Sequence, residues 1–75
     1  MADILVYPNP TNSFVNIKGN LINVNNVSVY SISGKKLLEL KNEFNKVDIS
    51  NLQSGIYFLK IASDNNFKTF KVVIE

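Results

Sequence analysis

The sequence contains no cysteine, no histidine and no tryptophan. Without cysteine, the chain can form neither disulfide bonds nor thiolate metal sites. Without histidine, it lacks the commonest metal ligand and the side chain that most often performs acid–base catalysis near neutral pH. Its serine and threonine hydroxyls have no histidine to activate them, which argues against a serine hydrolase. We therefore expect a protein that is not an enzyme and that uses no cofactor.

Arginine is also absent, so all eight basic residues are lysines, set against six acidic residues for a net charge of +2. Nucleic-acid binders usually rely on clustered arginine for bidentate contacts to phosphates and bases. The lysines here are spread from Lys18 to Lys71, and only Lys35 and Lys36 are adjacent. No apolar run approaches the roughly 20 residues of a membrane helix. We expect no nucleic-acid partner and no membrane span.

The chain has 75 residues, enough for one domain of limited core size. Residues 1–3 are interpreted as a start added for expression or as the remnant of a linker. Residues 4–75 are expected to form the single domain, as a monomer. Twelve asparagines favour turns and weaken helices.

Short β-type runs separated by turn residues dominate the pattern, and no segment keeps an apolar period of 3.6 residues. This pattern predicts an all-β fold, an immunoglobulin-like antiparallel sandwich of about seven strands. The expected strands cover residues 4–7, 14–17, 27–32, 36–40, 46–49, 56–62 and 67–74. The third and fourth should form a hairpin through Ser33-Gly34. In the last strand Phe67 and Val73 fall out of step with the other apolar residues, which predicts a bulge.

The sixth strand is the most apolar. Leu59 and Ile61 lie on one face with Tyr57, whereas Ile56 and Phe58 lie on the other. Apolar residues on both faces predict a central strand, or a strand covered by a partner.

Three residues around the start of this strand form a structural motif. Leu52 precedes a corner, Gly55 lies in it and Tyr57 follows it, as in the tyrosine corner of Greek-key sandwiches, where the phenol hydroxyl bonds to upstream backbone. An exposed aromatic that stacks on a ligand is the alternative interpretation, and we favour the structural one.

Further turn motifs are structural as well. Pro8-Asn9-Pro10 lacks two backbone donors and cannot lie inside a sheet ladder. Asp48 and Asp64 could in principle bind a metal, but no calcium-loop pattern surrounds them. Asp48 is expected to bond the backbone of the Ser50 turn, and Asp64 to shape its own hairpin. We expect no metal site and no small-molecule substrate.

With these motifs in order, the chain resembles the type A C-terminal sorting domains of the type IX secretion system of Bacteroidetes. The resembling segments are Val6-Tyr7-Pro8-Asn9-Pro10, Val27-Ser28-Val29-Tyr30 with Ser33-Gly34-Lys35, Asp48 to Tyr57, and Lys71-Val72-Val73. The resemblance implies a label for an attached N-terminal cargo protein. It implies passage through the periplasm, recognition by the outer-membrane translocon, removal by a sortase-like protease, and a final location at the cell surface or outside the cell.

The final strand is the expected recognition element, with Lys68, Lys71, Val72 and Val73 as its candidate residues. The face that carries Ile56 and Phe58 is the alternative. A different class of function also stays open, an adhesive or carbohydrate-binding sandwich module of a surface protein. Such modules usually show several exposed aromatic side chains on one face, often tryptophan.

Overall fold

The structure is a computed structural model that describes residues 4–8 and 10–75. This described part contains seven β-strands and no helix, and therefore no helix that could cross a membrane. The strands are β1 (Leu5–Tyr7), β2 (Phe14–Lys18), β3 (Val24–Ser31), β4 (Lys36–Leu40), β5 (Lys46–Asp48), β6 (Gly55–Ser63) and β7 (Phe67–Ile74).

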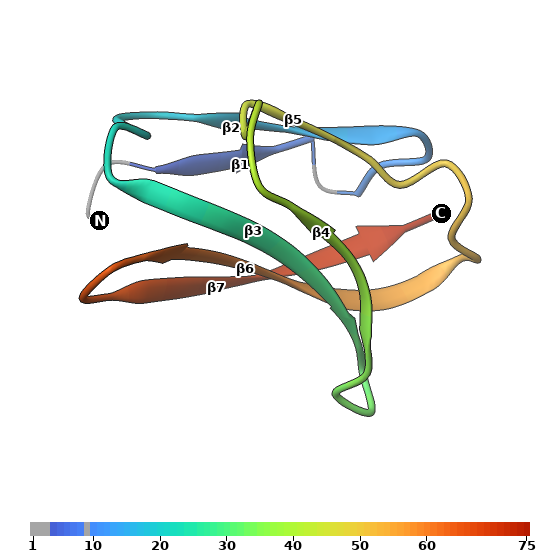
Figure 1. Cartoon of the computed structure of the whole chain (residues 1–75). Helices are drawn as coiled ribbons and strands as arrows, with labels where there is room; N and C mark the ends of the chain where they lie inside the picture. The colour runs from blue at the N-terminus through green and yellow to red at the C-terminus, as the bar shows by residue number, and fades with distance from the viewer. Residues whose placement is uncertain (1–3, 9) are drawn as a thin grey trace.

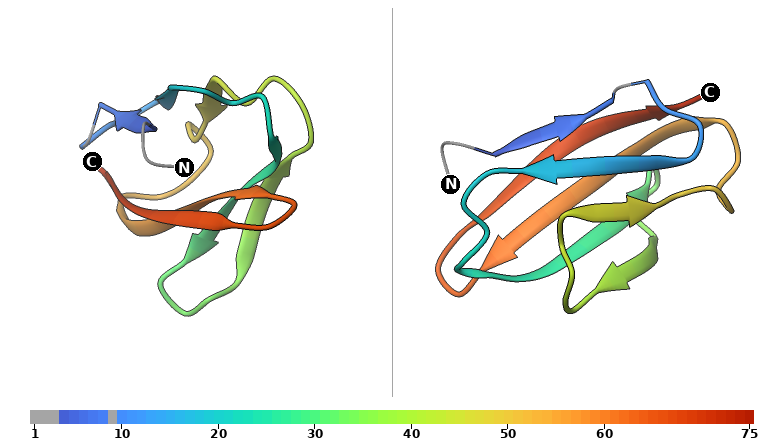
Figure 2. Two further views of the ribbon diagram at one scale, coloured as in Figure 1. Left: turned by 90° about the vertical axis from the view of Figure 1, so that its left-hand side faces the viewer. Right: turned by 90° about the horizontal axis from the view of Figure 1, so that it is seen from above.

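The strands form two antiparallel sheets that face each other as layers (Figure 1). One sheet has three strands in the order β1-β2-β5, and the other has four in the order β4-β3-β6-β7. The two further views in Figure 2 show the same layers end-on and from above. The predicted immunoglobulin-like sandwich of about seven strands is confirmed.

The core lies between the sheets and is built by alternation along each strand. Every second residue of a strand points inward, so apolar residues two apart share the buried face. The buried apolar residues are Ile4, Val15, Ile17, Val24, Val27, Val29, Val47, Ile49, Leu59, Ile61, Val72 and Ile74. Leu59 and Ile61 on β6 have no exposed surface, and β6 pairs with β3 and β7 on its two sides. The prediction that this strand is central is confirmed.

The third strand begins earlier than predicted. The expected strand began at residue 27, after two asparagines, yet β3 starts at Val24 and passes through both of them. A register irregularity between Val24 and Asn26 lets β3 stay paired with β6. At the other end Ile32 belongs to the turn and is 70% exposed. Pairing with a long neighbouring strand has overridden the local preference of asparagine for turns.

The bulge predicted in the final strand is absent, and that prediction was wrong. β6 and β7 pair without a register shift from Gly55 opposite Ile74 to Ala62 opposite Phe67. Phe67 and Val73 instead lie on the face of β7 that points away from the core. The strand departs from simple alternation because both of its faces carry apolar side chains.

The hairpin between β3 and β4 closes through Gly34, as predicted. Its φ of +93° lies in the region that favours glycine. The Gly34 N–H donates to the Ser31 carbonyl oxygen at 2.9 Å, and the Ser31 N–H donates to the Lys35 carbonyl oxygen at 2.8 Å. The tip of this hairpin points away from the three-stranded sheet (Figure 1).

The corner before β6 has the geometry of a tyrosine corner. The Tyr57 hydroxyl donates to the Gln53 carbonyl oxygen at 2.6 Å. Leu52 packs against the core, and its N–H donates to the Ile49 carbonyl oxygen at 3.0 Å. Gly55 has a φ of +153°, which side chains rarely adopt. These contacts hold the chain where it crosses from β5 in one sheet to β6 in the other.

Replacing Tyr57 with phenylalanine should lower the free energy of unfolding by about 0.5–1.5 kcal/mol, the usual net worth of one hydrogen bond. Gln53 is exposed, so water can bond its carbonyl in the variant and the loss stays within that range. Urea unfolding of both proteins measures the difference. A midpoint that does not move would show that the bond adds nothing to stability.

The turn after β1 ties the beginning of the domain to its end. Pro8 and Pro10 are exposed and outside the strands, as predicted, while Asn9 lies outside the described residues. Thr11 follows and forms a parallel bridge with the end of β7. Its N–H donates to the Val73 carbonyl oxygen at 2.9 Å, and its carbonyl accepts from the Glu75 N–H at 2.8 Å. The last residues of the chain are thereby held in place.

Candidate recognition surface

The structure separates the four candidate recognition residues of β7. Val72 is 3% exposed and belongs to the core. Lys68 shares its side of the strand and lies opposite Ile61. Lys71 and Val73 lie on the opposite side, which faces away from the other sheet. The four residues therefore do not form one surface, and only Lys71 and Val73 can be contacted together.

The strand register places Lys71 and Val73 on the outer face of the four-stranded sheet. Phe58 lies opposite Lys71, and Ile56 lies opposite Val73. The outer face includes the side chains of Asn26, Ser28, Tyr30, Lys36, Glu39, Ile56, Phe58, Lys60, Ala62, Phe67, Thr69, Lys71 and Val73, and Lys41 reaches it from the end of β4. The two alternatives raised by the sequence, the final strand and the face of Ile56 and Phe58, thus share one surface.

One row of the outer face runs across all four strands. Lys36 on β4 lies opposite Tyr30 on β3, Tyr30 lies opposite Phe58 on β6, and Phe58 lies opposite Lys71 on β7. The two aromatic residues are half-buried, and both lysines are exposed. An apolar centre is therefore bounded by a cation at each edge of the sheet. Sequence reasoning missed this row because its four residues are far apart in the chain.

Long side chains cover part of the outer face. Ser28 points outward yet is only 2% exposed; its neighbours across the strands are Glu39 and Lys60. The Lys60 ammonium lies 4.5 Å from the centre of the Phe67 ring, a cation–π contact. Phe67 keeps 59% of its surface exposed and Ile56 keeps 41%. Both side chains therefore present apolar surface to the solvent.

The positive charge of the domain is concentrated on this face. The outer face carries four lysines and one glutamate, which gives 4 − 1 = +3. The rest of the chain carries four lysines and five acidic residues, which gives 4 − 5 = −1. Glu39 accepts ion pairs from Lys36 at 3.5 Å and from Lys41 at 3.9 Å. The outer face is therefore cationic, and the rest of the chain offsets its charge to the net +2 of the whole domain.

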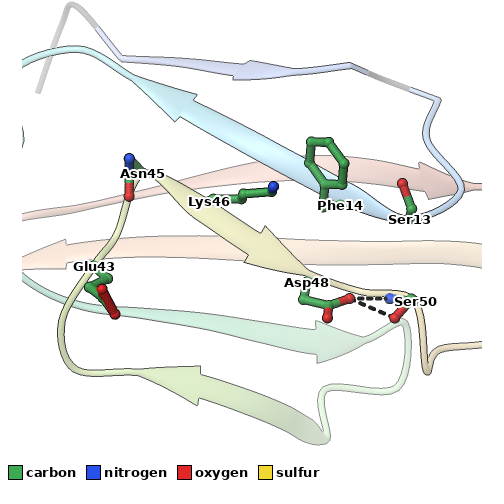
Figure 3. Close-up of a pocket in the computed structure, with 7 residues that line it drawn as sticks. All are labelled: Ser13, Phe14, Glu43, Asn45, Lys46, Asp48 and Ser50. Carbon is green, nitrogen blue, oxygen red and sulfur yellow. Dashed lines mark hydrogen bonds between the residues drawn. The ribbon is translucent and has the colours of Figure 1, made fainter.

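A shallow hollow of about 570 Å³ lies on the opposite sheet (Figure 3). Its lining residues are Ser13, Phe14, Glu43, Asn45, Lys46, Asp48 and Ser50. The Lys46 ammonium sits 4.1 Å from the centre of the Phe14 ring. Asp48 accepts from the N–H of Ser50 at 2.9 Å and from its hydroxyl at 2.6 Å, as predicted. Asp48 and Ser50 are thus bonded to each other, and the Lys46 ammonium lies against the Phe14 ring.

The two Ser50 hydrogen bonds, from the side chain first and the backbone second, lower the pKa of Asp48 below its ordinary value of 3.8. A carboxylate with a lowered pKa stabilises the fold above its unfolded-state pKa, and that contribution is lost as the pH falls through the folded-state value. Asp48→Asn keeps an acceptor but cannot titrate. The stability advantage of the natural protein over this variant should therefore hold at neutral pH and shrink below about pH 4. Thermal melts of both proteins across this range test it, and a constant difference would contradict it.

Asp64 does not act as predicted. Its carboxylate accepts a hydrogen bond of 2.7 Å from the side-chain amide of Asn25, at the start of β3. Its own hairpin is closed instead by Ser63 and Asn66, through the Ser63 N–H and the Asn66 carbonyl oxygen at 2.8 Å. The side-chain oxygen of Asn66 also accepts from the Phe67 N–H, at 2.9 Å. Across the described residues, no three acidic side chains gather as a metal site would require.

The comparison with protein families decides what this domain is. The model of the secretion system C-terminal sorting domain matches residues 5–75, from the first strand to the last residue. The chain belongs to this family. A search of curated proteins found no match.

As a sorting domain, the chain is a type IX secretion signal, which directs export across the outer membrane to the surface or the medium. Its partners are the secretion machinery that recognises it and the cargo to which it is attached. The family is not a catalytic one. The function of such a domain depends on a surface that another protein can recognise. The outer face is such a surface, because it brings together candidate residues from β6 and β7.

Proposed function

We propose that this sorting domain folds in the periplasm, is recognised there by the type IX translocon through β7, and is then removed from its cargo by a sortase-like protease. Membership of the family carries the proposal. It favours a sorting signal over an adhesive or carbohydrate-binding module.

The geometry of β7 supports a division of labour among the four candidate residues. Val72 is buried, so it acts as a positioning residue that holds the strand on the core. Val73 is half-buried and Lys71 is exposed on the outer face, where a partner can reach both. Lys68 is exposed on the other side, and its ammonium lies 5.4 Å from the centre of the Phe70 ring. A translocon that contacts both lysines must wrap around the edge of the sheet.

The direct test is a fusion of the 75-residue chain to the C-terminus of a periplasmic reporter. In a host with a type IX system, the reporter should appear at the surface or in the medium with the chain removed. In the same host without the translocon, it should stay in the periplasm. Reporter that is retained in both hosts would refute the proposed function, whereas export of the uncleaved fusion would refute only the protease step.

Lys68→Ala combined with Lys71→Ala should leave the domain folded and cause the reporter to accumulate in the periplasm. Exposed substitutions of this kind change stability by less than about 0.5 kcal/mol. The control is Lys18→Ala with Lys35→Ala, which removes the same charge elsewhere and should be exported normally. The two single variants then assign the recognised side of β7. Full export of the folded double variant would place recognition outside these lysines.

A further inference from the structure

We infer that the outer face of the four-stranded sheet docks a protein surface that presents apolar side chains flanked by carboxylates. This inference rests on the proposed function, because it describes the surface of the secretion machinery that reads the domain.

The arrangement of the outer face is that of a binding patch. The row Lys36-Tyr30-Phe58-Lys71 spans the sheet, with both aromatic rings on the middle strands and one lysine on each edge strand. Protein interfaces combine an apolar centre, rich in aromatic residues, with a polar rim. With neighbouring strands about 4.8 Å apart, the backbones of the two lysine residues lie about 14 Å from one another across three strand spacings. Acidic groups of the partner should therefore lie on both sides of its apolar side chains.

Charge identifies the kind of partner. The net charge of +3 on the outer face, against −1 on the remainder, favours an acidic surface, since complementary charge speeds association and selects partners. A second copy of this domain would bring two faces of the same sign together, which is unfavourable.

A lipid surface fits less well than a protein. Membrane-surface binding needs apolar side chains that enter the lipid by about 5–10 Å. Tyr30 and Phe58 are half-buried in the middle of the sheet and offer little surface for insertion, so only Phe67 and Ile56 expose much apolar surface on this face. A flat protein surface can contact Tyr30 and Phe58 at their positions in the sheet.

The experiment uses the reporter fusion and reverses charge at both edges with Lys36→Glu and Lys71→Glu. Export should fall at least about tenfold, because two attractive contacts become repulsive. The matched control is Lys18→Glu with Lys35→Glu, which changes the net charge equally on exposed residues outside the outer face and should be exported like the natural chain. Melting curves of the purified fusions establish that both variants are folded.

A graded series separates charge from side-chain shape. At positions 36 and 71, arginine should preserve export, glutamine should reduce it, and glutamate should reduce it most. If the glutamate pair unfolds the domain, the glutamine pair still decides, because its export must fall for the inference to stand. Equal export of the natural, glutamine and glutamate forms would overturn the inference, as would equal loss with arginine.

Two further outcomes have distinct meanings. A natural fusion that is never exported contradicts the proposed function itself, whereas an exported natural fusion with insensitive variants contradicts only the acidic docking surface. Vesicles of phosphatidylcholine and phosphatidylglycerol in equal amounts test the lipid alternative. The purified fusion should not bind them. If it does bind, and Lys36→Glu with Lys71→Glu abolishes the binding, the inference of a protein partner is overturned.

Discussion

Deletion of residues 71–75 should unfold the domain. It removes Val72 and Ile74, which are 3% and 4% exposed in the core, and each such side chain contributes roughly 1.5–3 kcal/mol by burial. It also removes the backbone partners of Thr11, a residue that is only 6% exposed. A domain of this size usually has about 3–5 kcal/mol of stability in total, so the loss should exceed what is available.

Circular dichroism and thermal melting of the truncated chain measure this directly, with deletion of Glu75 alone as the control. The control loses one hydrogen bond to Thr11 and should remain folded. A cooperative melt in the chain that lacks residues 71–75 would show that β7 is dispensable for the fold. In the reporter fusion the truncated chain should not be exported, and Lys71→Ala then separates the loss of fold from the loss of a contact.

Replacing Leu59 with alanine should have the second large effect. Leu59 has no exposed surface, and it lies on the central strand between Val29 and Phe70. Truncating a buried leucine costs about 2–5 kcal/mol, because the lost burial is joined by a cavity that the surroundings fill only partly. Most or all of the stability of this small domain should disappear.

Urea unfolding should therefore show a variant that is largely unfolded in buffer or that unfolds at a much lower midpoint. The matched control is Ile56→Ala on the same strand, at a position that is 41% exposed, where the loss should be well below that of Leu59→Ala. Similar losses at the two positions would contradict the assignment of the two faces of β6. Export of a Leu59→Ala fusion that is unfolded would show that the translocon reads a linear segment and not a folded surface.

Local patterns predicted most of the strands. The fourth and last strands, 36–40 and 67–74, have the predicted bounds, because alternating apolar residues and the Ser33-Gly34 turn are features of neighbouring residues. The corner at Tyr57 was predictable for the same reason. The start of β3 was not, because a run through two asparagines is stable only when β6 lies beside it.

The grouping of residues on the recognition surface could not be predicted from the sequence. Grouping Lys68 with Lys71 treated neighbours in the chain as neighbours in space, whereas a spacing of three residues places them on opposite faces of a strand. Asp64 illustrates the same limit, since its hydrogen-bond partner Asn25 is 39 residues away in the chain.

The sequence alone determined that the protein is an all-β sandwich, where most strands begin and end, and which family it resembles, because these follow from composition, alternation and short motifs. The tertiary structure decided which residues share a surface. It brought Lys36, Tyr30, Phe58 and Lys71 into one row and assigned Val72 to the core. The physical reason is that strand order and register are set by contacts between distant segments as they bury a common core, and a local pattern does not specify which segments those are.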